Sequence, residues 1–279
     1  MRRTGVFGRE RASSYNSQMH LVDIGANLTH ESFRHDFEAV LARAKQHGIE
    51  QIVVTGASKE GSEHALELSR AHPNVLFATA GVHPHHASDY DADTDMLLRT
   101  LLREPEVKAI GETGLDYHRN YSPRASQLAA FEKQLAIAIE TRKPLFLHQR
   151  DAHDDFLALL KTVRDEVPAA VVHCFTDTRE ALHDYLDLDC HIGITGWICD
   201  ERRGAHLREL VREIPANRLL LETDAPYLLP RTVRPQPSHR RNEPMYLAHI
   251  CEQVARDRDE PAEITAVHAA TAARAFFDL

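Results

Sequence analysis

The chain has 279 residues and a net charge of −9, with 43% hydrophobic and 27% charged residues. This acidic balance excludes a protein that coats nucleic acid electrostatically, because such binders carry a basic surface. No stretch approaches the ~18 apolar residues that span a bilayer, so we expect no membrane partner. An acidic enzyme can still act on a polyanion where cationic side chains gather at one cleft.

The first 18 residues differ in character from the rest of the chain. They are basic, rich in Ser and Arg, and poor in large apolar side chains. We therefore expect residues 1–18 to be a disordered extension and residues 19–279 to form one domain. The four cysteines form no C-x-x-C pair, which indicates reduced thiols in a cytoplasmic protein.

From residue 20 onward, short apolar segments alternate with longer amphipathic ones. The apolar segments are rich in Val, Ile and Leu, as is typical of parallel strands buried on both faces. We expect strands at 20–27, 51–56, 75–84, 107–116, 144–150, 169–175, 191–196 and 219–226. Helical periodicity is clearest at 33–47, 62–71, 127–141 and 207–213.

This alternation predicts a single (β/α)₈ barrel, the closed arrangement of eight strand–helix units. An open doubly wound sheet is the alternative. That fold normally shows a glycine-rich nucleotide loop after its first strand, and the segment DIGANLT at 23–29 lacks one. The long polar, proline-rich loop from Pro230 to Pro244 follows the last strand and is expected to serve function.

Polar side chains cluster where the expected strands end. The active site of such a barrel lies at the carboxyl ends of its strands. The polar residues at these ends are Asp23, Asn27, His83, His85, Glu112, Asp116, His148, Arg150, His173, Glu222 and Asp224. Four of them, Glu112, His148, His173 and Asp224, come from separate strands and are ligand types that bind divalent metals. Burying these charged and polar side chains together would cost free energy if no metal were present. We therefore expect all four side chains to converge on a metal ion.

Several longer motifs resemble those of one known family. They are GVHPH (81–85), AIGETGLDY (109–117), PLFLHQRDA (144–152), VVHCFT (171–176), GITGW (193–197) and LLLETDAPYLLP (219–230). Together with DIGANLT and RRNEP (240–244) they resemble the TatD-type deoxyribonucleases, in order, over residues 20–279. The resemblance implies a metal-dependent nuclease among the amidohydrolase-like barrels, typically a 3′–5′ exonuclease that prefers single strands.

The resemblance also implies roles for individual residues. Glu112 is expected to be a metal ligand that can bridge two ions, with His148 and His173 as further ligands. Asp224 is expected to be a ligand that also orients or deprotonates the attacking water. His83 is expected near the scissile phosphate, so Asp224, Glu112 and His83 are the candidate catalytic residues.

One departure concerns the first strand, where many relatives carry H-x-H and this chain carries Gly25 and Asn27. Losing two imidazoles weakens one of two potential metal sites. We therefore expect one tighter ion and one weaker ion near Asp224. Imidazole ligands favour Zn²⁺ or Mn²⁺ over Mg²⁺, whereas the resemblance implies Mg²⁺.

Candidate substrate contacts lie in the loops. Arg119, Arg150, Arg240 and Arg241 can each bind a phosphate through two nitrogens, and Asn27 offers a further polar group. Surface ion pairing is the alternative for each arginine. Trp197 or Tyr117 could stack on a base, with core packing as the alternative for both.

The residues themselves predict metal-assisted hydrolysis. The resemblance implies an exonuclease that acts on 3′ ends of single-stranded DNA or RNA and releases 5′-mononucleotides, and we expect a monomeric, cytoplasmic protein associated with DNA repair. Two alternatives stay open at this stage. One is an amidohydrolase-like enzyme for a small ester, lactone or amide, although the fourth strand carries Glu112 where a carboxylated lysine would support it. The other is a catalytically impaired binding protein.

Overall fold

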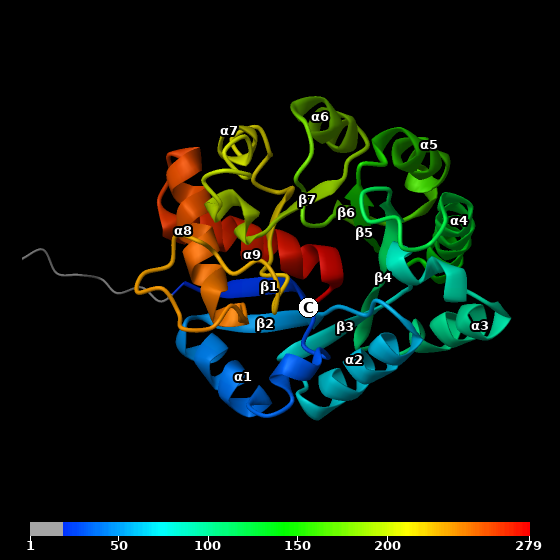
Figure 1. Ribbon diagram of the computed structural model, residues 1–279, viewed down its shortest axis with the longest axis horizontal. Helices are drawn as coiled ribbons and strands as arrows, with labels where there is room; N and C mark the ends of the chain where they lie inside the picture. The colour runs from blue at the N-terminus through cyan, green and yellow to red at the C-terminus, as the bar shows by residue number, and fades with distance from the viewer. Residues whose placement is uncertain (1–18) are drawn as a thin grey trace, which may run out of the picture.

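The computed structural model describes residues 19–279, so the expectation of a disordered extension concerns residues outside the described part. Eight parallel strands form one sheet in sequence order (Figure 1). They are β1 (Leu21–Ala26), β2 (Ile49–Val54), β3 (Leu76–Ala80), β4 (Val107–Asp116), β5 (Leu145–Arg150), β6 (Ala170–Val172), β7 (His191–Ile194) and β8 (Leu219–Leu221). All eight expected strands are confirmed, and several are shorter than the apolar segments suggested.

Helices follow the strands and surround them in Figure 1. They are α1 (Phe37–Gln46), α2 (Lys59–Ala71), α3 (Ala92–Leu101), α4 (Arg124–Thr141), α5 (His153–Val163), α6 (Arg179–Asp187), α7 (Leu207–Leu210), α8 (Leu247–Arg258) and α9 (Ala262–Phe277). The helix expected at 33–47 begins only at Phe37, because residues 31–33 form a separate 3₁₀ helix. None of the helices within residues 19–279 has the length and apolar character needed to cross a membrane.

Side-chain and backbone hydrogen bonds join β1 to the segment after β8. The amide and hydroxyl of Thr223 donate to the Asp23 carboxylate at 2.9 and 2.5 Å. The Asp224 amide donates to the Gly25 carbonyl at 2.8 Å. Burial raises the pKa of Asp23 to about 7, against the opposing hydrogen bonds from Thr223. These contacts bring the first and last strands together, so the barrel is nearly closed and the open doubly wound alternative is wrong.

The C-terminal helix α9 covers the end of the barrel where the strands begin. Its Phe276 and Phe277 pack in one buried cluster with strand residues that include Val22, Phe146 and Leu220. The Lys108 ammonium at the start of β4 donates to the Asp278 carbonyl just beyond the helix. In Figure 1 this helix, in red, lies across the strands, and the chain ends near the centre of the view. The helix therefore closes the apolar end of the interior.

The same strand face that packs on α9 carries the polar site at the opposite end. Side chains two residues apart on a strand share a face. Phe146 lies in the apolar cluster, and His148 follows it by two residues. In the same way, Val171 precedes His173, and Leu220 precedes Glu222. The barrel interior is thus apolar where strands begin and polar where they end.

His191 at the start of β7 is a titratable group in the apolar end. Its ring meets the Phe276 ring edge-on at 5.0 Å between centroids, and the residue is 9% exposed. Burial lowers the pKa of His191 from 6.5 to about 4. The unfolded chain therefore binds more protons than the folded one between these two pH values, and stability is lost as pH falls through this window.

We predict that His191→Leu makes the protein less sensitive to acid. The wild type should lose about 2–3 kcal/mol of unfolding free energy through this one group between pH 7 and pH 4. Urea unfolding at the two pH values measures the loss. The matched control is His64→Leu, at an exposed position on α2, which should keep the wild-type difference. An equal acid loss in His191→Leu would contradict the assignment.

Candidate metal centre and active site

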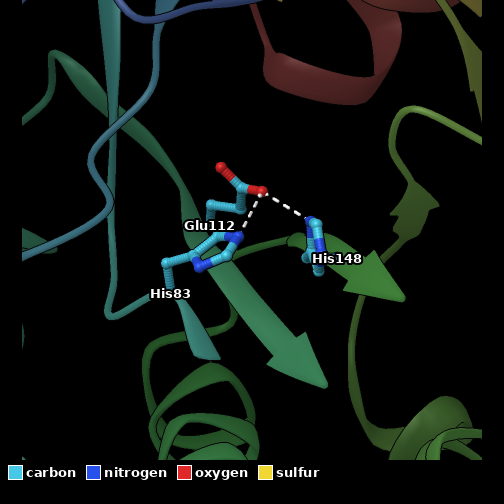
Figure 2. A group of neighbouring side chains, drawn as sticks. All are labelled: His83, Glu112 and His148. Carbon is cyan, nitrogen blue, oxygen red and sulfur yellow. Dashed lines mark hydrogen bonds and ion pairs between the residues drawn. The ribbon is translucent and has the colours of Figure 1, made fainter. Parts of the chain in front are cut away.

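The Glu112 carboxylate is the meeting point of three imidazoles. Its Oε1 atom lies 3.2 Å from His83 Nε2, 2.8 Å from His148 Nδ1 and 2.7 Å from His173 Nε2. Figure 2 shows His83 and His148 both pointing at this carboxylate, His148 from β5 and His83 from the segment after β3. His148 Nδ1 and His173 Nε2 are 3.3 Å apart. Residues from the ends of β3, β4, β5 and β6 thus converge on one oxygen.

This cluster has the donors and spacing of a divalent-cation site. Within the described part of the chain, one donor atom each from His83, Glu112 and His148 lie within 4.8 Å of one another. His148 Nε2 is buried and has no hydrogen-bond partner, although Asp116 Oδ2 lies 3.5 Å away as an ion pair. Imidazole and carboxylate together suit Zn²⁺, Mn²⁺ and related ions. The residues present therefore fit a divalent metal.

Two glycines allow the Glu112 strand to come close to β5. Gly111 and Gly114 have φ values of 143° and 144°. A Cβ at Gly114 would lie 1.9 Å from the His148 carbonyl oxygen, and one at Gly111 would lie 2.1 Å from the Phe146 carbonyl oxygen. Only glycine fits such conformations and distances. The G-E-T-G segment is therefore a packing requirement that holds Glu112 against His148.

The charges in the cluster depend on one another. Burial alone would raise the pKa of Glu112, but the His173 and His83 imidazoles and the hydrogen bonds to His148 and His173 hold it well below its usual range. Burial also lowers the pKa of His83 to about 4, despite the opposing effect of Glu112. His83 is accordingly neutral at pH 7, the form in which an imidazole binds a metal. The site thus combines an ionised carboxylate with a neutral imidazole.

The carboxylates of Asp116 and Glu222 contact the ligand imidazoles on the side away from Glu112. This supporting role was not among the expectations for the two residues. Asp116 Oδ2 lies 2.8 Å from His85 Nε2 in addition to its approach to His148. Glu222 is fully buried, and its Oε2 lies 3.3 Å from His173 Nδ1. Carboxylates in this position orient ligand imidazoles and raise their basicity. Both residues end apolar strand segments, which was the signal that could have identified them.

Glu222 also explains the departure at the first strand. A Cβ at Gly25 would lie 2.6 Å from Glu222 Oε2, and a Cβ at Gly193 would lie 2.5 Å from Glu222 Oε1. The Cys174 amide donates to the same Oε1 at 2.5 Å. The Glu222 carboxylate therefore fills the space beside Gly25, and no side chain larger than hydrogen fits there without moving it.

Asp224, which follows β8, lines the same cavity. Its Oδ1 accepts a hydrogen bond of 2.9 Å from Asn27 Nδ2. Burial raises the pKa of Asp224 to about 7, against the lowering effect of His173. Among the described residues, the group with donors within 4.8 Å of one another is formed by His83, Glu112 and His148. The Glu112 carboxylate also adds to the raised pKa of Asp224, so the structure adds His83 to the expected ligands and keeps Asp224 in the same electrostatic environment.

A cavity of about 1180 Å³ opens over the cluster. It is lined by four of the expected substrate-contact residues, Asn27, Arg119, Arg150 and Arg240. Arg203, which was not among the expected contacts, also lines it. The cavity is therefore rimmed by arginines even though the whole chain is acidic.

The expected substrate contact of Arg241 requires correction. Its guanidinium forms ion pairs of 2.7 Å with Asp36 and with Glu243, and it also donates to the Ser32 carbonyl. In the described part of the chain it is not among the residues that line the cavity. Its partner Asp36 is 205 residues away in sequence. Arg241 therefore anchors the long loop to the segment before α1, and its neighbour Arg240 faces the cavity.

Of the two residues expected to stack on a base, Trp197 lies in the cavity and Tyr117 does not. Trp197 lines the cavity, and the Arg203 guanidinium lies 5.7 Å from its ring centroid. The Tyr117 hydroxyl donates to Asp155 at 2.7 Å, and the Arg124 guanidinium covers its ring at 4.1 Å. Tyr117 is thus occupied by neighbours outside the cavity, as the packing alternative expected.

We predict that Gly25→Ala weakens metal binding without contacting the metal. The added methyl group pushes on the buried Glu222 carboxylate, which is in contact with His173. Disturbing the support of a ligand imidazole typically lowers metal affinity about 10- to 100-fold. Titration calorimetry with Mn²⁺ measures this affinity, and Gly61→Ala, whose Cβ would meet only the Ser58 hydroxyl at 3.2 Å, is the control. Unchanged affinity in Gly25→Ala would contradict the role of Glu222.

Comparison with known proteins agrees with this geometry. The sequence profile of the family described as "TatD related DNase" matches residues 22–278. A protein of Pantoea ananatis named 3′-5′ ssDNA/RNA exonuclease TatD is 51% identical over 259 residues, which cover 93% of this chain and 100% of the relative. A protein of the same name from Edwardsiella piscicida is 53% identical over 87% of this chain and 93% of its own.

A solved structure leads to the same family. The crystal structure of a TatD homologue from Escherichia coli K12 superposes with a TM-score of 0.84 at 29% identity. The match covers 93% of this chain and 98% of that one. The fold, the strand-end ligands and the profile over 22–278 agree, and the chain belongs to the TatD-related DNase family.

Proposed function

We propose that this protein is a metal-dependent nuclease that removes nucleotides from the 3′ ends of single-stranded DNA and RNA. The observation that carries the proposal is the convergence of three imidazoles on the Glu112 carboxylate at the floor of an arginine-rimmed cavity. The relatives at 51% and 53% identity, which carry the name of such an exonuclease, support the direction and the substrate.

The ligand cluster defines where a metal would be held. Glu112, His83, His148 and His173 would bind the tighter divalent ion, and Asp224 with Asn27 would contribute to a weaker one. A bound ion supplies Lewis-acid chemistry that polarises a phosphoryl oxygen and acidifies water. We propose Mg²⁺ as the supporting ion, since the family resemblance implies it, with Mn²⁺ or Zn²⁺ as the ions that imidazole ligands favour.

Asp224 is the proposed base. Its carboxylate has a pKa of about 7 and is held by the Asn27 amide, so it can accept a proton near neutral pH. Water deprotonated there would attack the phosphorus in line, and the 3′ oxygen of the preceding nucleotide would leave. The released product is a 5′-mononucleotide. His83, which is neutral, lies where it can contact a phosphoryl oxygen as well as a metal.

The arginines at the rim of the cavity are the proposed binding groups for the phosphates of the substrate. Arg119, Arg150, Arg203 and Arg240 line the cavity, and guanidinium groups bind phosphates through paired hydrogen bonds. With a net charge of −9, the rest of the surface repels nucleic acid. We therefore propose that the enzyme engages a short stretch at the strand end. Cytoplasmic location, a monomeric state and a part in DNA repair stay predictions.

We predict that chelation abolishes cleavage. A single-stranded oligonucleotide labelled at its 5′ end should shorten stepwise from the 3′ end in the presence of Mg²⁺, and EDTA should stop the reaction. Chromatography of the products should show 5′-mononucleotides. The same assay with Mn²⁺ and Zn²⁺ ranks the ions. If no ion supports release of nucleotides, a small ester, lactone or amide becomes the better substrate class.

We also predict that Glu112→Ala and Asp224→Ala each reduce cleavage by at least about 100-fold. The first removes the carboxylate shared by the imidazoles, and the second removes the proposed base. Circular dichroism should show an unchanged fold. Glu209→Ala, at a side chain that is 80% exposed, is the control and should keep wild-type activity. Wild-type rates in Asp224→Ala would overturn its role as base.

A further inference from the structure

Two exposed tyrosines lie at the mouth of the cavity. Tyr121 is 66% exposed and Tyr227 is 51% exposed, and both line the cavity over the metal cluster. The other large hydrophobic side chains exposed in the described part of the chain are aliphatic and lie outside this cavity: Val75, Met96, Ile264 and Val267. Exposed aromatic rings are thus concentrated at the site, where they are suited to stack on a flat or aromatic group of a ligand.

Tyr121 is connected to the ligand cluster by a row of rings. It follows β4, and its ring lies 4.7 Å from the His85 ring between centroids. The His85 ring in turn lies 4.1 Å from the His83 ring. The Tyr121 hydroxyl accepts a hydrogen bond of 3.3 Å from Arg119 Nη1. The ring is therefore supported on one side and open to the cavity on another.

Tyr227 is fixed next to the proposed base. Its backbone amide donates to the Asp224 carbonyl at 2.9 Å. Its ring meets the His30 ring edge-on at 5.8 Å and 80°, so its faces are not stacked on that neighbour. Tyr227 lines the same cavity as Glu112 and His148, which puts it close to the metal cluster.

The barrel separates the two rings. Tyr121 follows β4 and Tyr227 follows β8, and these strands lie half a turn apart in a barrel of eight. The rings therefore stand on different walls of the cavity, with the cluster between them. A phosphodiester at the cluster would send its two flanking bases towards opposite walls.

We propose that Tyr121 and Tyr227 are stacking platforms for the two unpaired bases that flank the scissile phosphate, and that they restrict the enzyme to single strands. This inference rests on the proposed nuclease function. A ring can stack on any base, so the platforms tolerate all sequences. Bases at a duplex end remain paired and stacked, and cannot turn towards opposite walls.

Oligonucleotides that lack single bases test the proposal. The variants Tyr121→Ala, Tyr121→Phe, Tyr227→Ala and Tyr227→Phe are compared on a normal single strand. They are then compared on strands with an abasic residue at the last or at the next-to-last position. Met96→Ala, at a side chain that is 63% exposed and outside the cavity, is the control. Fluorescence anisotropy of a labelled strand in EDTA reports binding separately from cleavage.

Each alanine variant should lose about 5- to 100-fold in kcat/KM on the normal strand, the size expected for one lost stacking contact. On a strand that lacks the base which a given tyrosine stacks on, the alanine variant of that tyrosine should be as active as the wild type. On the other abasic strand, the same variant should still be less active than the wild type. The abasic position that removes the difference should not be the same for Tyr121 and Tyr227. The phenylalanine variants should keep wild-type rates, since they retain the ring. Binding in EDTA should weaken in parallel with kcat/KM for the alanine variants.

Three results would overturn the proposal while the wild type remains an active nuclease. They are alanine variants that match the wild type, losses that persist on both abasic strands, and phenylalanine variants that lose as much as alanine. Failure of the proposed function looks different, because the wild type itself would then release no nucleotides with any ion.

Discussion

A buried carboxylate surrounded by three imidazoles is the interaction on which the rest of this site depends. An ionised Glu112 at the floor of the cavity is stable only because His83, His148 and His173 compensate it. Other features of the local structure serve this contact. Glycine on either side of Glu112 lets the strand approach its neighbour, and carboxylates behind the imidazoles hold their rings. The same compensation prepares the cluster for a divalent cation, whose charge can replace that of the protons.

On the strand face that points into the barrel, the residues at one end stabilise the fold and the residues at the other end form the site. Where strands begin, residues such as Phe146 and Val171 pack against α9 and exclude water. Two residues later, the same face carries His148 and His173. Glu112 and His148 lie within strands whose other end is packed in the core, and His173 directly follows such a strand, so the core fixes their positions. Substitutions at the apolar end should act on stability, and those at the polar end on metal binding.

Two residues beside the ligands adopt left-handed backbone conformations. Cys174, directly after His173, has a φ of 46°, and Asp224 has a φ of 55°. Non-glycine residues reach these angles at a cost, so the surrounding contacts must hold them. The Cys174 amide is held by Glu222, and the Asp224 amide by the first strand. Tertiary hydrogen bonds thus hold these two residues in conformations that are costly for a non-glycine residue.

The barrel and the strand-end ligands can be predicted from the amino-acid sequence, because parallel strands bring their carboxyl ends together whatever the loops do. The missing imidazole at Gly25 can be located in the same way. The folded chain was needed to show that Glu222 fills the adjoining space, and that Arg241 pairs with Asp36 while Arg240 faces the cavity. It likewise placed Tyr227 at the mouth. A loop side chain such as Arg241 pairs with a residue 205 positions away in the sequence, and no local sequence pattern predicts that pairing.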